Sequence, residues 1–163
     1  MTYAGSRVCN DADSHVMETF DWVSSHADPS IRDRLLELDV GARRARDQIK
    51  GLIEKSEARI ADPALQAKYD HNVVAGSKGW LGYGAFDKDE RKKAMDDLGF
   101  RQQLVFATFS GTQYLPSKDL DVIYGGVRAH NRAMTAFCGV DNRLAAVGQV
   151  SLVDAKRAVE EIH

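Results

Sequence analysis

Residues 87–109, DKDERKKAMDDLGFRQQLVFATF, decide the fold, because they join the signals of a complete helix directly to an apolar strand. Asp87 and Glu90 stand at capping-box spacing and Gly99 supplies a stop, which predicts a helix over residues 86–98. The run at residues 104–109 is apolar and rich in strand-forming residues, but it does not alternate cleanly. This pattern predicts an interior parallel strand that is covered on both faces.

The same alternation of elements continues toward the C-terminus. Apolar residues at helical spacing predict a helix over residues 118–137, although two central glycines weaken it by about 1 kcal/mol each. A turn at residues 141–143 then leads to an apolar strand at 144–152 and a further helix at 154–162. Strands that alternate with helices predict right-handed crossovers and a parallel sheet, so we expect an α/β protein.

The remaining segments read as an insertion and a loop. Residues 29–70 are charged, with leucines and isoleucines that predict one or two amphipathic helices, inserted between the first strand and its returning helix. Residues 72–86 are rich in glycine and predict a loop, with Trp80 and Tyr83 as its aromatic anchors. The chain, residues 1–163, is expected to form one domain.

Composition excludes several classes of function. The 22 basic residues nearly balance the 24 acidic ones, so no broad field favours nucleic acid or an anionic membrane. No apolar stretch approaches the roughly 20 residues that span a bilayer, and the N-terminus lacks the apolar core of a secretory signal. Cys9 and Cys138 have no metal-type spacing and are expected to be reduced small hydrophobes. These features predict a cytoplasmic protein.

Residues 11–18, DADSHVME, hold the candidate site at the end of the first strand-like run. Alternation along a strand sends Asp11, Asp13 and His15 to one face, so Asp13 and His15 can reach one ion together. A carboxylate with an imidazole is a ligand set for zinc, manganese or iron. The spacing also fits a local interpretation, in which the two aspartates cap a turn and His15 forms a local hydrogen bond.

Two further positions, Glu18 and His26, are candidates with two interpretations each. Glu18 either orients a metal ligand or is the first-turn acid of a helix. His26 follows the first strand and either approaches the mouth of the site or is solvated or locally bonded. Asp11, Glu18 and His26 are therefore the candidate supporting or substrate-facing residues. The cluster His130-Asn131-Arg132 is expected to pack and cap a helix rather than to act in catalysis.

Six segments together resemble the amidohydrolase-2 family, which includes enzymes similar to aminocarboxymuconate semialdehyde decarboxylase and resorcylate decarboxylase. They span nearly the whole chain in family order, and the set is more specific than any one member. The segments are Asp11 to Glu18, Gly79-Trp80, Arg91 through Met95 to Phe100, Gln103 to Thr108, Ala129 to Met134, and Asp141 to Gly148.

The resemblance implies a metal-dependent (β/α)8 TIM barrel whose first strand ends in His-x-His, or in Glu-x-His in decarboxylase-like members. Asp13-Ser14-His15 stands in that place, so the resemblance implies Asp13 and His15 as ligands of a divalent zinc, manganese or iron ion. The shorter carboxylate keeps the ligand class but changes its reach. The other ligands of the family, histidines from middle strands and a late aspartate, have no counterpart here.

The length sets a limit on the barrel. A closed eight-stranded barrel needs about 250 residues, whereas 163 residues supply about three strand-helix units. Three parallel strands would leave an apolar edge and an uncovered core, so a partner chain or self-association is expected to complete the barrel.

Two hypotheses of function from different classes follow. The first is an N-terminal portion or subunit of a metal-dependent amidohydrolase-type enzyme, a hydrolase or a non-oxidative carboxy-lyase, acting on a small molecule such as a carboxylate. The second is a non-catalytic interaction subunit or fragment that completes a barrel with a partner chain. In either case, the chain alone is expected to be inactive.

Overall fold

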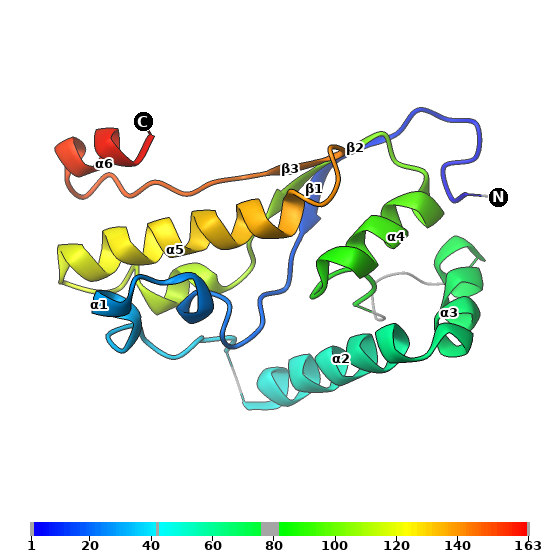
Figure 1. Cartoon of the computed structure of the whole chain (residues 1–163), viewed down its shortest axis with the longest axis horizontal. Coiled ribbons are helices and arrows are strands. Elements are labelled where there is room, and N and C mark those ends of the chain that lie inside the picture. The colour runs from blue at the N-terminus through cyan, green and yellow to red at the C-terminus, as the bar shows by residue number, and fades with distance from the viewer. Residues whose placement is uncertain (1, 42, 76–81, 163) are drawn as a thin grey trace.

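The computed structural model describes residues 2–41, 43–75 and 82–162, with only the backbone described for residues 70–75. Its sheet has three parallel strands, β1 (Asn10–His15), β2 (Gln102–Phe106) and β3 (Leu144–Ala146), in the order β1-β2-β3. Helices α4 (Lys88–Leu98) and α5 (Leu120–Cys138) lie beneath the sheet, and α6 (Ala155–Ile162) follows β3 and packs at the far end of α5, as Figure 1 shows. The predicted α/β class with three strand-helix units is confirmed.

Helix α4 begins and ends where local signals predict. The Asp87 carboxylate accepts hydrogen bonds from the backbone N–H groups of Asp89 and Glu90, and Gly99 ends the helix in the left-handed region at φ 71°. The predicted capping box is only half formed, however. The Glu90 side chain turns away from Asp87 and enters a buried ion pair with a distant helix.

That ion pair attaches the inserted helices to the rest of the fold. Arg59 Nε donates to Glu90 Oε1 at 2.6 Å, and both side chains are buried. Ser56 Oγ and the Gly84 N–H donate to the other carboxylate oxygen at 2.8 and 2.9 Å. Because the carboxylate is fully hydrogen-bonded, burying this charge costs much less than burying a bare one.

The inserted segment contains more helix than loop. After β1 come η1 (Ser24–His26), α1 (Pro29–Arg32), α2 (Arg43–Ala61) and α3 (Pro63–Ala75). Since α3 continues to Ala75, the predicted loop begins later than residue 72. Tyr83 anchors this loop as predicted, because its hydroxyl donates to Asp97 Oδ2 at 2.8 Å. The other predicted anchor, Trp80, lies outside the described residues.

Strand β2 lies in the middle of the sheet as predicted, but only one of its faces is covered. Gln103 and Val105 point into the helical layer and are buried, whereas Leu104 on the opposite face is 44% exposed. The prediction of two covered faces was therefore wrong. An apolar run without alternation is typical of a strand that is buried on both faces. In this chain helices cover one face of β2 and leave the other exposed.

Strand β3 is shorter than predicted. It ends at Ala146 instead of residue 152, because β2 turns away after Phe106 and no further strand lies beside residues 147–152 among those described. Side chains of α5 hold this extended segment instead. The amide of Asn131 bonds to both the N–H and the C=O of Gln149, at 2.8 and 2.9 Å, as a neighbouring strand would.

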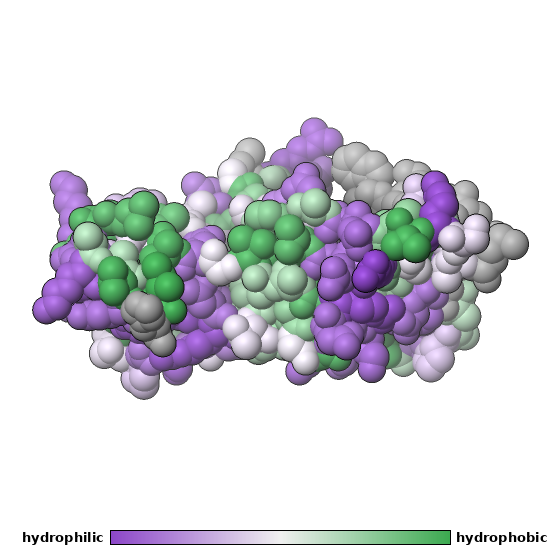
Figure 2. All heavy atoms as spheres, turned by 90° about the horizontal axis from the view of Figure 1, so that it is seen from above, coloured by the Kyte–Doolittle hydropathy of each residue, from purple (hydrophilic) through white to green (hydrophobic). Residues whose placement is uncertain are grey.

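The face of the sheet opposite the helices is strongly apolar. Figure 2 looks onto this side and shows hydrophobic side chains gathered over the sheet and over the end that carries α6. Exposed apolar residues of this part of the chain are Leu104, Val150, Leu152, Val153, Val159 and Ile162. The uncovered core predicted from the chain length is therefore present in the fold.

Two other predictions can be compared with the fold. Both cysteines are free; Cys138 is buried among apolar residues, whereas Cys9 is half-buried. Among the described helices, none combines the length and apolar character that crossing a bilayer requires.

Candidate metal centre

The candidate residues gather where β1 and β2 end. His15 is the last residue of β1, and Thr108 lies two residues beyond the end of β2. In parallel α/β folds the loops at the carboxyl ends of the strands carry the reacting groups, because adjacent strands deliver them to one edge. His15 and Thr108 therefore lie at the edge where such folds carry their reacting groups.

Asp13 and His15 lie together at this edge. Asp13 Oδ1 is 3.3 Å from His15 Nε2, and the two side chains are 92% and 46% exposed. The pair forms although strand alternation is interrupted, because the pairing of β1 with β2 shifts register between Asp11 and Ser14. The bulge turns Ser14 into the protein and leaves Asp13 and His15 in solvent.

Asp11 has a different environment from the pair. Its Oδ2 accepts a hydrogen bond from the buried Gln103 amide at 3.1 Å, and its Oδ1 accepts the Asp13 backbone N–H at 3.1 Å. This is the turn-capping arrangement that the sequence left open for Asp11. Its carboxylate supports the backbone of Asp13 and is engaged on both oxygens.

The Thr108 hydroxyl lies beside the other ring nitrogen of His15, Nδ1. The Thr108 hydroxyl donates to the Val16 carbonyl at 2.8 Å, so its oxygen is free to accept from His15 Nδ1, which lies 3.3 Å away. With the proton on Nδ1, the Nε2 atom of the neutral imidazole carries a lone pair. In that tautomer the lone pair faces the Asp13 carboxylate and could bind a cation, whereas a proton on Nε2 would form the local hydrogen bond to Asp13 Oδ1.

The pair fits a divalent ion as one half of its ligand set. Two ligands held about 2.1 Å from a tetrahedral ion lie roughly 3.4 Å apart, close to the 3.3 Å between Asp13 Oδ1 and His15 Nε2. The hydrogen bond from Nδ1 to an oxygen is also the usual second contact of a metal-bound histidine. Within the described ranges, however, no group of three or more His, Cys, Asp or Glu side chains could hold a metal.

Glu18 fixes the loop that carries Thr108. It is buried, and its carboxylate accepts the backbone N–H groups of Thr108, Phe109 and Ser110 at 2.9 to 3.0 Å. The alternative in which Glu18 is the first-turn acid of a helix was wrong, since η1 begins only at Ser24. Instead, Glu18 caps the start of η2 (Ser110–Gln113), about 90 residues away in the chain.

Arg91 supports the pair from beneath the sheet, and sequence reasoning did not single it out. Its guanidinium donates to the His15 carbonyl at 2.5 Å and to Ser14 Oγ at 2.8 Å. Burial lowers the Arg91 pKa to about 10, which leaves the group charged at neutral pH. Arg91 and Thr108 lie within the segments that carry the family resemblance, and this was the signal available for finding them.

His26 does not join the pair. Its Nδ1 lies 3.1 Å from the Trp22 carbonyl, and its own carbonyl accepts from Arg132 of α5 at 3.3 Å. The imidazole thus packs in the helical layer, which is the locally bonded alternative.

His130 and Asn131 make packing contacts, as predicted. His130 is fully buried with its Nδ1 2.8 Å from Ser110 Oγ, and burial lowers its pKa to about 4.

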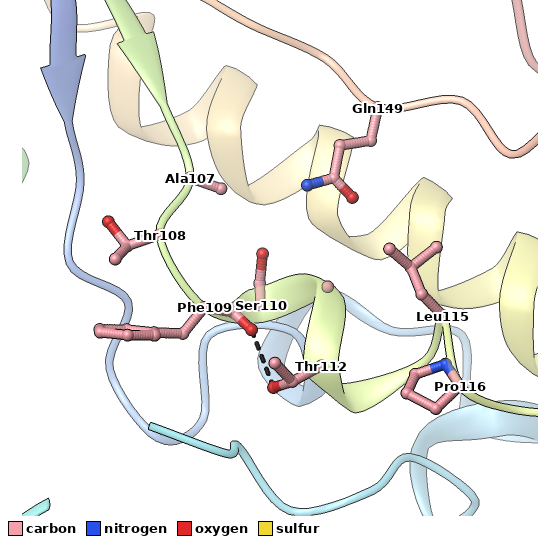
Figure 3. Close-up of a pocket in the computed structure, with 9 residues that line it drawn as sticks. Ala107, Thr108, Phe109, Ser110, Thr112, Leu115, Pro116 and Gln149 are labelled. Atoms are coloured by element: carbon pink, nitrogen blue, oxygen red, sulfur yellow. Dashed lines mark hydrogen bonds between the residues drawn. The ribbon is translucent and has the colours of Figure 1, made fainter. Parts of the chain in front are cut away.

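A cavity of about 390 Å³ opens beside Thr108. Its walls come from residues 107–112 and from Leu115, Pro116 and Gln149. Figure 3 shows the side chains of Ser110 and Gln149 reaching into it from opposite sides, with Thr108 at its edge. The cavity therefore adjoins the residue that orients His15.

Comparison with solved structures identifies similar folds. One is a crystal structure of an amidohydrolase from Mycobacterium avium subsp. paratuberculosis, with a TM-score of 0.60 and 24% sequence identity. The fold of this chain is similar to part of that protein's fold. The match covers 96% of this chain and 46% of that chain, so the chain spans about half the length of that protein. No protein-family model and no curated protein matches the chain.

Proposed function

We propose that this chain supplies the first-strand metal ligands of a metal-dependent amidohydrolase-type enzyme. Asp13 and His15 would hold a divalent zinc, manganese or iron ion, and the remaining ligands would come from the part of the barrel that this chain does not contain. The observation that carries the proposal is the approach of His15 Nε2 to within 3.3 Å of the Asp13 carboxylate at the end of β1.

The surrounding residues support this role by holding the two ligands still. In this role Thr108 would accept a hydrogen bond from His15 Nδ1, and Glu18 holds the Thr108 loop by its backbone. Arg91 fixes the His15 carbonyl, so both sides of the imidazole are restrained. Such outer contacts typically contribute a factor of about 10 to 100 in metal affinity.

The reaction class follows from the ligand set. A bound divalent ion would activate water for hydrolysis or polarise a carboxylate for non-oxidative carbon–carbon cleavage. The cavity beside Thr108 would receive a small-molecule substrate, a carboxylate being the type that suits cleavage. Neither side chain of the pair is free to serve as a general acid or base while it binds an ion, so that group belongs to the rest of the barrel.

The open face of the sheet supports the second part of the proposal, that further strand-helix units cover it. Leu104 on the sheet is 44% exposed, and Leu152 beyond β3 is 80% exposed. Exposed apolar surface on this scale typically marks an interface. The cover would be the rest of a barrel, from the same or a partner polypeptide, or a second copy of this chain. A non-catalytic interaction subunit would use the same surface.

Binding of manganese to the chain tests the proposal. Mn²⁺ should broaden the backbone NMR signals around Asp13, His15 and Thr108 first, and Asp13→Ala or His15→Ala should remove this effect. His26→Ala is the matched control and should leave it unchanged. Broadening that begins elsewhere, or that survives both substitutions, would contradict the role of the pair and would favour the non-catalytic alternative.

A further inference from the structure

A second cavity lies on the other side of Phe109, between α2 and the segment that follows β1. Its volume is about 600 Å³, well within the range of small-molecule sites. Met17, Val40, Ile49, Leu52 and Phe109 form most of its wall, so the surface is largely apolar. We call this cavity the α2 groove.

A glycine in the middle of α2 keeps the groove open. Gly51 lines the groove, and a Cβ atom added there would meet no other atom within 4 Å. Glycine weakens a helix interior relative to alanine, and neither a close contact nor a positive φ requires it here. The missing side chain therefore leaves space over the apolar wall and serves no packing purpose within the described residues.

One cation stands at the edge of this apolar wall. Lys55 lines the groove one helical turn after Gly51, so both lie on the same face of α2. Throughout residues 2–41, 43–75 and 82–162, no hydrogen bond or ion pair engages the Lys55 ammonium, and no acidic residue lines the groove. An apolar surface with a single unpaired cation complements a ligand with an apolar body and one negative charge.

We propose that the α2 groove binds a small apolar monoanion, with its ring or acyl chain against Met17, Leu52 and Phe109 and its anionic group at Lys55. The site is separate from Asp13 and His15 and does not need a metal. It therefore goes beyond the proposed function, and its failure would leave that proposal untouched.

Methionine methyl NMR with cinnamate as the probe tests the site in the full chain without metal. Met17 lines the groove, whereas Met95 and Met134 are fully buried in the main core and serve as internal controls. Cinnamate should shift the Met17 methyl signal and leave the two core methionines unchanged. Cinnamyl alcohol, which lacks the charge, should bind more weakly.

Three variants separate the contributions. Gly51→Leu fills the groove without a backbone clash and should abolish the Met17 shift while the melting temperature does not fall. Lys55→Gln should weaken binding about three- to five-fold, as expected for an exposed ion pair. Lys50→Gln, on the same helix but away from the groove, is the matched control and should leave binding unchanged.

Three results would overturn the proposal. One is a cinnamate-induced shift of Met17 that persists in Gly51→Leu, and another is the absence of any shift in the unmodified chain. The third is a Met17 signal that moves with protein concentration alone, since this would mean that a second copy of the chain fills the groove.

Discussion

Replacing Glu18 by Gln should destabilise the fold more than any other single change at the site that preserves shape. The Glu18 carboxylate accepts three successive backbone N–H groups, from Thr108, Phe109 and Ser110, at 2.9 to 3.0 Å. Hydrogen bonds to a charged acceptor are worth about 1.5–3 kcal/mol each, against about 0.5–1.5 for neutral ones. Losing the charge should therefore cost about 1 kcal/mol per bond, or about 3 kcal/mol in all.

Urea denaturation followed by circular dichroism measures this loss as a change in the free energy of unfolding. In thermal unfolding a loss of about 3 kcal/mol corresponds to a fall of roughly 6–12 °C for a domain of this size. Glu54→Gln, an exposed glutamate on α2, is the control and should change the free energy by less than about 0.5 kcal/mol. A loss below about 1 kcal/mol for Glu18→Gln would refute the reasoning.

Three other predictions concern the ion pair, a buried histidine and the open face. Arg59→Met should cost about 3–5 kcal/mol of unfolding free energy because it leaves the buried Glu90 carboxylate without its cation, whereas a loss under about 1 kcal/mol would contradict this. Burial holds the His130 pKa at about 4, below its usual 6.5, so the unfolded chain binds the extra proton and stability should fall as pH drops from 6.5 to 4. Urea midpoints should show a loss of about 3 kcal/mol over this range that His130→Gln lacks, and equal pH profiles would disprove the assignment. Leu152→Asp together with Val153→Asp should reduce self-association of the chain in sedimentation experiments without lowering the melting temperature, and unchanged association would exclude this face as the contact.

Local signals in the sequence predicted the local structure well. The cap at Asp87 and the stop at Gly99 depend on side chain and backbone groups within a few residues, so they could be read directly. The pairing of Asp13 with His15 also followed from their spacing, although a β-bulge, which has no clear sequence signal here, now separates them from Asp11. The predicted roles of Asp13 and His15 as metal ligands stay predictions.

Partners that are distant in sequence could not be predicted in the same way. Glu18 and Glu90 looked like helix-capping acids, but their carboxylates bind groups about 90 and 31 residues away. The apolar run around Leu104 predicts a buried strand. It does not predict whether the residues that bury this strand belong to the same chain. Thr108 and Arg91 are ordinary strand and helix residues by pattern, and only the fold places them beside His15.

The most direct test of the central claim is to measure which nitrogen of His15 carries the proton. Long-range proton–nitrogen NMR correlation gives this before and after addition of Zn²⁺. The account predicts that neutral His15 carries its proton on Nδ1, that Thr108→Val weakens this preference, and that Zn²⁺ shifts the Nε2 signal in the unmodified chain but not in Asp13→Ala. Two results would contradict this: a neutral His15 imidazole protonated on Nε2, or an Nε2 signal that does not shift when Zn²⁺ is added. Either would show that Asp13 and His15 form a local hydrogen bond and not half of a metal site.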